Sequence, residues 1–122
     1  MGMKHDRVAG SLVTSDATPS QVSGAAITLG DGNEGVCLCW LSAKSGANTK
    51  GFLLWASVER AAGGAAAIIG SPLSVVVAQG DAGLVLAVAT LVAAGNTIVP
   101  QVTGIALTSI TWTVLMELVA TY

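Results

Sequence analysis

Very few residues of this chain have the chemistry for acid–base, nucleophilic or metal-assisted catalysis. Its single histidine is His5, and its two cysteines, Cys37 and Cys39, are separated by one residue. A hydrolase of the triad type needs a serine or cysteine nucleophile, a histidine base and a carboxylate that orients the base. His5 is the only base available, and the sequence has no Gly-x-Ser-x-Gly turn of the α/β-hydrolase type. We therefore predict that the protein is not an enzyme.

Carboxylates offer a second route to catalysis, because a suitably spaced pair can cleave a glycosidic bond. The chain has seven, and most of them fall in expected turns or at expected strand ends. They are Asp6, Asp16, Asp31, Glu34, Glu59, Asp81 and Glu117. The sequence alone leaves a glycosidase pair open, but solvated turn carboxylates are the far commoner explanation.

The stretch Gly30–Gly35 matches the Gly-x-Gly-x-x-Gly pattern of dinucleotide-binding loops by letter. That motif requires a helix whose N-terminus receives the pyrophosphate, whereas a strand is expected to follow here. An EF-hand that starts at Asp31 would need Gly and Glu where the chain has Val36 and Ser42. We predict a hairpin loop with neither cofactor nor metal, and an irregular calcium loop is the minor alternative.

Cys37 and Cys39 lie on the same face of an expected strand. Same-face Cα atoms in a strand are about 6.5–7 Å apart, at the limit of disulfide reach. The chain has no second cysteine pair to complete a metal site, and His5 lies near the terminus. We predict that both cysteines are reduced residues of the core.

The three tryptophans, Trp40, Trp55 and Trp112, are large aromatic surfaces of the kind that line sugar-binding sites. On strands as apolar as theirs, tryptophans more often serve as core residues or as anchors of an interface. The sequence does not say which of the three belong to which class.

The segment Ile110–Tyr122 predicts a long strand around which the others are arranged. Its even-numbered positions are almost all apolar, and its odd-numbered positions are only half polar. A strand with one fully apolar face belongs inside a sheet, and a half-polar second face favours a further packing partner.

Further strands are expected along the rest of the chain, separated by Gly-rich turns. They span Gly24–Leu29, Val36–Ala43, Gly51–Arg60, Ala65–Gly70, Leu73–Ala78, Leu84–Ala94 and Thr97–Thr103. The composition of Leu84–Ala94, which is apolar except for Thr90, predicts burial on both faces. Pro100 predicts that its strand lies at an edge or contains a bulge.

Turns every 8–12 residues and the near absence of helix-compatible segments predict an all-β chain. We expect an antiparallel β-sandwich or jelly-roll-like barrel of about eight strands. Residues 1–12 are expected to form an extended N-terminal arm that lies on a neighbouring subunit, because Met1–Arg7 is polar and has no periodic pattern. Residues 13–122 are expected to form the single domain.

Charged residues make up 10% of the 122 residues, against a typical figure of about 25%. So few charges cannot cover the surface of a small domain, which predicts burial against other copies or another protein. A net charge of −2 without a basic cluster argues against nucleic acid. The longest apolar run is shorter than the roughly 20 residues of a membrane-spanning helix, and no signal peptide is expected. We therefore expect a protein made in a cytoplasm.

Five short motifs occur in a suggestive order along the chain. They are Thr14–Pro19, Gly63–Ser71, Asp81–Ala82, Val102–Gly104 and Ile110–Trp112. In order and spacing they resemble a family of small β-structured accessory virion proteins of tailed bacteriophages and prophages, from Val13 onward. Members of that family share a Thr-Asp-Ala-Thr-Pro opening, a Gly-Gly-x-Ala-Ala hairpin and a closing Val-Thr-Gly…Ile-x-Trp strand. This chain departs from them in having far fewer charges between the motifs.

The resemblance implies a non-enzymatic virion protein that decorates and cements the outer shell of a phage particle as a homo-oligomer, most simply a trimer. The major capsid protein or another virion protein would then be its partner. The alternative is a receptor- or glycan-binding module of a tail or head fibre. We expect contacts with other subunits or the shell at Met1, Met3, His5, Arg7, Trp55, Trp112, Met116 and Tyr122.

Overall fold

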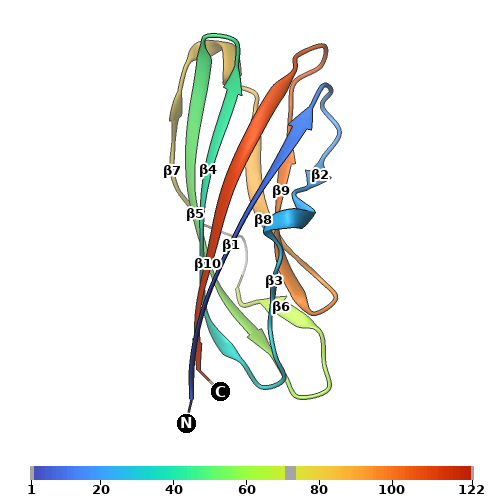
Figure 1. The fold of residues 1–122 in the computed structure, drawn as a ribbon, viewed down its shortest axis with the longest axis vertical. Coiled ribbons are helices and arrows are strands. Elements are labelled where there is room, and N and C mark those ends of the chain that lie inside the picture. The colour runs from blue at the N-terminus through green and yellow to red at the C-terminus, as the bar shows by residue number, and fades with distance from the viewer. Residues whose placement is uncertain (1, 71–73, 122) are drawn as a thin grey trace.

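The protein is an all-β sandwich of two antiparallel sheets, as predicted (Figure 1). The computed structural model describes residues 2–70 and 74–121. In chain order the elements are β1 (Met3–Thr14), β2 (Ser20–Gln21), η1 (Ser23–Ala25), β3 (Ile27–Thr28), β4 (Glu34–Ser45), β5 (Asn48–Arg60), β6 (Ala66–Ile68), β7 (Ser74–Gly80), η2 (Ala82–Leu84), β8 (Val88–Ala94), β9 (Thr97–Thr103) and β10 (Ile110–Thr121). Several of these strands are very short, so the number of strands exceeds the predicted eight.

The larger sheet has six strands and the smaller sheet has four. In the larger sheet the order is β1-β10-β4-β5-β6, and β7 also pairs with β5. In the smaller sheet β9 is central, with β8 along one side and the short strands β2 and β3 along the other. Figure 1 shows the two sheets facing each other, with the chain termini together at one end.

Strand β10 lies inside the larger sheet, between the edge strand β1 and β4, as expected for the last segment of the chain. It pairs along its whole length with β1 on one side, and over Thr111–Thr121 with β4 on the other. Its alternate side chains Ile110, Trp112, Val114, Met116, Leu118 and Ala120 are all buried. They pack with the inward side chains of β4 and β5 and with residues of the smaller sheet in one core.

The core contains one buried polar contact of note, between Trp112 and Thr14. The Trp112 indole Nε1–H donates to the Thr14 Oγ1 at 3.0 Å, and both residues are buried. The hydrogen bond ties the end of β1 to the beginning of β10, because the two residues lie on adjacent strands. The Phe52 ring of β5 lies 5.8 Å from the Trp112 ring, centroid to centroid.

The expected N-terminal arm over residues 1–12 is wrong for the part that the structure describes. Residues 3–14 form β1, an edge strand of the larger sheet of the same chain. The polar segment looked like a tail because its partners are distant in sequence. Lys4 reaches the Thr28 carbonyl at 3.1 Å, and Arg7 reaches Glu117 at 3.3 Å. The sandwich domain therefore begins at β1 and not at residue 13.

The expectation that Leu84–Ala94 is one strand buried on both faces is also wrong. Strand β8 begins at Val88, and Val85 and Leu86 are exposed, with 67% and 72% of their surfaces accessible. The reason is topological: β7 belongs to the larger sheet and β8 to the smaller, so this part of the chain must cross between them. Lys50 holds the crossing by donating to the Ala87 carbonyl at 2.7 Å.

Pro100 lies in the central strand of the smaller sheet, not at an edge or in a bulge. The Val22 N–H donates to the Pro100 carbonyl at 2.9 Å, but proline has no N–H to return to Val22. The Val22 carbonyl instead accepts the Ala25 N–H at 3.0 Å, which starts η1. The chain therefore leaves the sheet where proline cannot donate, and the strand expected over Gly24–Leu29 is reduced to β3.

Replacing Thr14 by Val, which has nearly the same shape, should leave the Trp112 N–H buried without an acceptor. The expected loss is about 1–3 kcal/mol in the free energy of unfolding. Urea denaturation followed by tryptophan fluorescence measures it. Thr111→Val, at an exposed position of β10, is the matched control and should change stability by less than about 0.5 kcal/mol. Equal effects of the two substitutions would contradict a role for the hydrogen bond.

Deleting residues 1–12 should destabilise the sandwich by several kcal/mol, because it removes most of β1 and uncovers one side of β10. Within this segment Val8 and Leu12 pack against the core. Complete burial of such a side chain contributes about 1.5–3 kcal/mol. Chemical denaturation tests this expectation, with deletion of residues 1 and 2 as the control. A 1–12 deletion that unfolds at the same denaturant concentration as the full chain would restore the arm hypothesis.

Candidate functional site

The candidate site is the side of the larger sheet that faces away from the smaller sheet, called here the outer face. It is formed by the outward-pointing residues of β1, β10, β4 and β5, which the strand register places in rows across the sheet. One central row is Ala9, Leu115, Trp40 and Leu53, and the next is Arg7, Glu117, Leu38 and Trp55. Two tryptophans and three leucines thus occupy neighbouring positions on the middle of this face.

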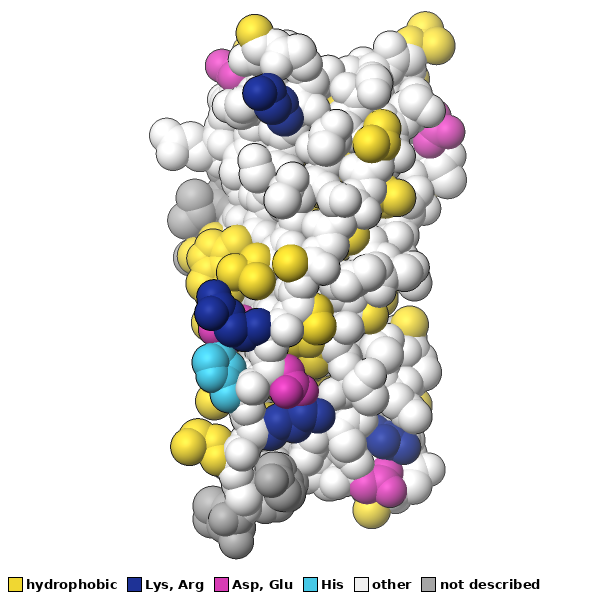
Figure 2. Space-filling model, in the orientation of Figure 1, with side chains coloured by type: hydrophobic (Ala, Val, Ile, Leu, Met, Phe, Trp, Pro, Cys, Tyr) yellow, Lys and Arg dark blue, Asp and Glu magenta, His cyan; other side chains and the backbone are white. Residues whose placement is uncertain are grey.

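The outer face carries an unusual amount of exposed apolar surface. Trp40 and Trp55 each expose 39% of their surface and Met3 exposes 74%. Among the described residues, six of the eleven exposed large hydrophobic side chains lie on this face: Met3, Val13, Val36, Trp40, Trp55 and Val119. In Figure 2 hydrophobic side chains gather beside basic and histidine side chains along the left-hand border of the molecule.

Two open hollows of about 340 and 380 Å³ flank the Trp40 side chain. Ala9 and Leu115 contribute to the first, and Leu53 and Gln79 to the second. Both are lined mainly by apolar side chains, so the ring of Trp40 forms a ridge between two shallow apolar depressions. Such relief suits the insertion of side chains from another surface.

A charged cluster lies at one side of the outer face, across β1 and β10. The Glu117 Oε2 accepts from His5 Nε2 at 2.9 Å and from Arg7 Nε at 3.3 Å. Arg7 lies directly opposite Glu117 in the register, and His5 is its diagonal neighbour. The cluster balances the negative charge of Glu117, so this side of the face has no isolated carboxylate.

Of the residues expected at contacts, four lie on the exposed outer face and two lie in the core, and the contacts themselves remain a prediction. Met3, His5, Arg7 and Trp55 lie on the outer face, and Met1 and Tyr122 lie outside the described residues. Trp112 and Met116 are fully buried, because both share the inward parity of β10. They belong to the core and are corrected as contact residues.

Trp40 is the outer-face residue that the sequence did not select. It shares its parity on β4 with Leu38, Ser42 and Lys44, whereas Cys37 and Cys39 share the other parity. Ser42 and Lys44, which lie on the same side of β4 as Trp40, were the available signal that Trp40 points outward. Val36 and Leu38, which are apolar and lie on the same side of β4, obscured this signal.

The Gly30–Gly35 segment is a turn that leads into β4, but the predicted hairpin is wrong, because β3 belongs to the smaller sheet and β4 to the larger. The Asn33 Oδ1 accepts the Gly30 N–H at 2.8 Å, and Asp31 Oδ1 pairs with Arg60 Nη2 at 3.1 Å. These oxygens bind protein donors instead of converging on a cation. Within residues 2–70 and 74–121 there is no group of three or more His, Cys, Asp or Glu side chains close enough to hold a metal ion.

Two of the carboxylates outside the strands have structural partners. Asp16 accepts the Thr18 N–H at 2.9 Å, and Asp81 accepts the Thr49 N–H at 2.8 Å. Asp16 closes its own turn, and Asp81 ties the segment before η2 to the beginning of β5. Glu34 and Glu59, by contrast, lie directly opposite each other on β4 and β5, so a pair of neighbouring carboxylates exists at the ends of these strands.

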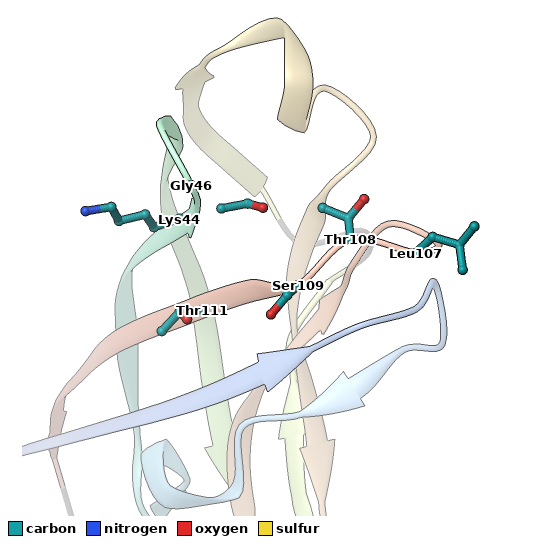
Figure 3. A pocket seen from close by; sticks show the side chains of 7 residues that line it. Lys44, Gly46, Leu107, Thr108, Ser109 and Thr111 are labelled. Atoms are coloured by element: carbon teal, nitrogen blue, oxygen red, sulfur yellow. The ribbon is translucent and has the colours of Figure 1, made fainter.

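A third hollow, of about 590 Å³, lies between the tip of the β4–β5 hairpin and the β9–β10 loop (Figure 3). The side chains of Lys44 and Leu107 point away from it, and Thr108, Ser109 and Thr111 line it with short hydroxyl groups. Leu107 is fully exposed and has a φ of 58°. Hydroxyls without a neighbouring base or acid support weak polar contacts at most.

No helix in the described ranges is long and apolar enough to cross a membrane. Comparison of the chain with protein-family models, with curated proteins and with solved structures finds no match. The fold and the outer face are therefore the basis on which a function can be proposed.

Both cysteines should be inert in the folded protein. Cys37 and Cys39 are free and buried, and burial raises the pKa of each thiol from 9.0 to about 12, with a smaller contribution of Cys37 to the rise at Cys39. At pH 8 we expect maleimide to label them only as fast as the protein unfolds. Rapid labelling of the native protein would contradict this.

The same shift predicts a loss of stability at high pH. Between pH 9 and about 12 the unfolded thiols ionise while the folded ones stay protonated, so stability should fall as the pH rises through this window. The difference between the wild type and a Cys37→Val/Cys39→Val variant isolates the contribution of the thiols from that of other titrating groups.

Proposed function

We propose that the protein is a non-enzymatic structural subunit of a tailed-phage particle, where it decorates and cements the outer shell. The observation that supports this most is the exposed apolar outer face, whose central rows hold Trp40, Trp55 and Leu115. Contiguous apolar surface rimmed by polar side chains marks a protein–protein contact. The order of motifs that resembles accessory virion proteins supplies the biological setting.

In this function, stabilisation comes from buried area and not from chemistry. Each subunit covers apolar surface against other copies and against the major capsid protein or another virion protein, and the added contacts oppose the pressure of the packaged genome. The extensively paired sheet is suited to that role, because preorganised surfaces lose little conformational entropy when they associate. A three-fold assembly is the simplest expectation from the resemblance.

The second candidate function is a glycan- or receptor-binding module of a fibre. The observation that favours it is the partial exposure of two tryptophan rings beside open hollows, since aromatic faces stack on sugar rings. The two functions differ in copy number. A cement protein occurs at every equivalent position of the shell, and a fibre module occurs only where fibres are attached.

Particles stripped of accessory proteins provide the test. Wild-type protein should rebind in numbers comparable to those of the major shell protein, measured by quantitative mass spectrometry. A Trp40→Ser/Trp55→Ser variant should lose at least about tenfold in affinity, because central aromatic anchors contribute 2 kcal/mol or more each. Val88→Ser, an exposed apolar residue of β8 in the other sheet, is the control and should bind like the wild type. Binding to glycan but not to particles would support the fibre module instead.

A further inference from the structure

The two ends of the outer face carry opposite charges that no partner in the described chain neutralises. At one end, Glu34 of β4 and Glu59 of β5 are exposed and lie directly opposite each other in the register. Two like charges in this position destabilise a sheet. At the other end, Lys44 of β4 is exposed on the same face.

Most of the other charged side chains are engaged within the subunit. Lys50 and Arg60, at the two ends of β5, donate to carbonyls of the crossing loops, and Lys4 donates to Thr28 of β3. Asp31 and Asp81 bind donors in turns. The charges at the two ends of the outer face are therefore the ones left for an external partner.

Spacing along β4 relates these two ends to the apolar centre. Glu34 and Lys44 are ten residues apart on one strand, which corresponds to about 33 Å at about 3.3 Å per residue. The midpoint falls between Leu38 and Trp40, in the middle of the apolar rows. Over β4 and β5 the face is thus acidic at one end, basic at the other and mainly apolar between them, whereas the His5, Arg7 and Glu117 cluster lies beside this apolar region on β1 and β10.

We propose that a second copy of this chain covers the outer face, related to the first by a two-fold axis that lies between the two sheets and crosses the strands at this midpoint. The inference rests on the proposed function, because it assigns the outer face to the contact between copies and leaves the contact with the shell to another surface of the pair. The rotation places every strand antiparallel over its own copy. The basic end of each face then lies over the acidic end of the other.

Apolar residues of β4, β5 and the ends of β1 also match under this rotation, whereas on β10 Leu115 faces Glu117, which His5 and Arg7 neutralise within its own subunit. Rows on either side of the axis exchange, so that Trp40 faces Leu38 of the second copy and Leu53 faces Trp55. At the ends of β1, Val13 faces Met3 of the second copy, and both are well exposed in the single chain. Two facing copies therefore cover the six large exposed side chains of the face together.

The alternatives fit less well. An axis parallel to the strands would place the basic end of one face over the basic end of the other, and the acidic end over the acidic end, so like charges would repel. A closed three-fold ring joins two different surfaces at each contact, so it cannot lay this face on itself. A three-fold particle contact would have to use another surface of the subunit.

The covered area is sufficient for a stable pair. Four strands at about 4.8 Å and a length of about 33 Å give roughly 640 Å² on each copy, or about 1,300 Å² in total. Stable interfaces bury about 1,200–2,000 Å². Stacked sheets lie about 10 Å apart and cross at about 30°. The expected attraction is therefore between the acidic end of one face and the basic end of the other, and not between particular pairs of atoms.

Charge reversal tests the inference by sedimentation equilibrium. The wild type should be a dimer whose dissociation constant rises with salt. Lys44→Glu should raise the dissociation constant at least about tenfold, because it faces two carboxylates of the second copy. Glu34→Lys/Glu59→Lys should do the same, and the triple variant should return to within about threefold of the wild type. Failure of the triple variant to recover would overturn the proposed orientation.

Crosslinking provides an independent measurement of the register. The rotation lays Ser42 over Val36 of the second copy, so a Val36→Cys/Ser42→Cys variant should form a covalent dimer with a bismaleimide of about 10 Å span. Ser42→Cys alone should not, because the two copies of that position are about 20 Å apart along the strands. The native cysteines are buried and do not interfere. Efficient crosslinking of the single variant would overturn the inference.

The outcomes also separate this inference from the proposed function. A wild-type chain that stays monomeric at high micromolar concentration but covers stripped particles would overturn the two-fold pair and leave the virion role. A dimer with the expected charge dependence that never binds particles would support the pair and overturn the virion role.

Discussion

The pairing of β10 with β1 on one side and β4 on the other is the constraint on which the rest of the molecule depends. Because β10 is paired on both sides over almost its whole length, its alternation of side chains is imposed on the neighbouring strands as well. Every strand of this group therefore has one parity that faces the core and one that faces outward. The bond from Trp112 to Thr14 holds the edge of the group in place at one end.

The distribution of charge follows from this arrangement. The chain has only five basic and seven acidic residues. Several of these side chains lie at the two ends of the sandwich, where they bind groups of the loops. Lys50 and Arg60 flank the apolar inward residues of β5 and donate to carbonyls of loops that lead to or from the smaller sheet. Long basic side chains suit this role, because their stems cover apolar surface while their heads reach polar groups. The smaller sheet is held by these contacts as well as by the core.

Because the chain has so few charged residues, the outer face is mainly apolar at its centre and charged at its rim. In a monomer this arrangement exposes two tryptophans and pairs two glutamates, both of which are unfavourable in water. Contact with another surface removes both costs at once, since it covers the rings and brings a cation to the carboxylates. The function proposed for the protein and the two-fold pair thus rest on one physical property of one face.

Local pattern was sufficient for much of the fold. The period-two alternation of β4, β5 and β10, the turns at Gly30–Asn33 and Ala61–Gly64, and the burial of Cys37 and Cys39 all depend on near neighbours in the chain, so the sequence predicted them. It also predicted the shortage of charge that leads to an apolar surface. These properties are decided by residue type and spacing within a few positions.

Tertiary structure alone decided the rest, because the deciding contacts join residues far apart in the chain. The polar start of the chain becomes β1 only when Glu117 and Thr28 are beside it. The apolar run from Leu84 divides into a crossing and a strand because its two ends belong to different sheets. Pro100 is tolerated in a central strand because the chain opposite it turns away at Val22. Composition predicted that apolar side chains would remain exposed, and the register of four strands determined where they lie.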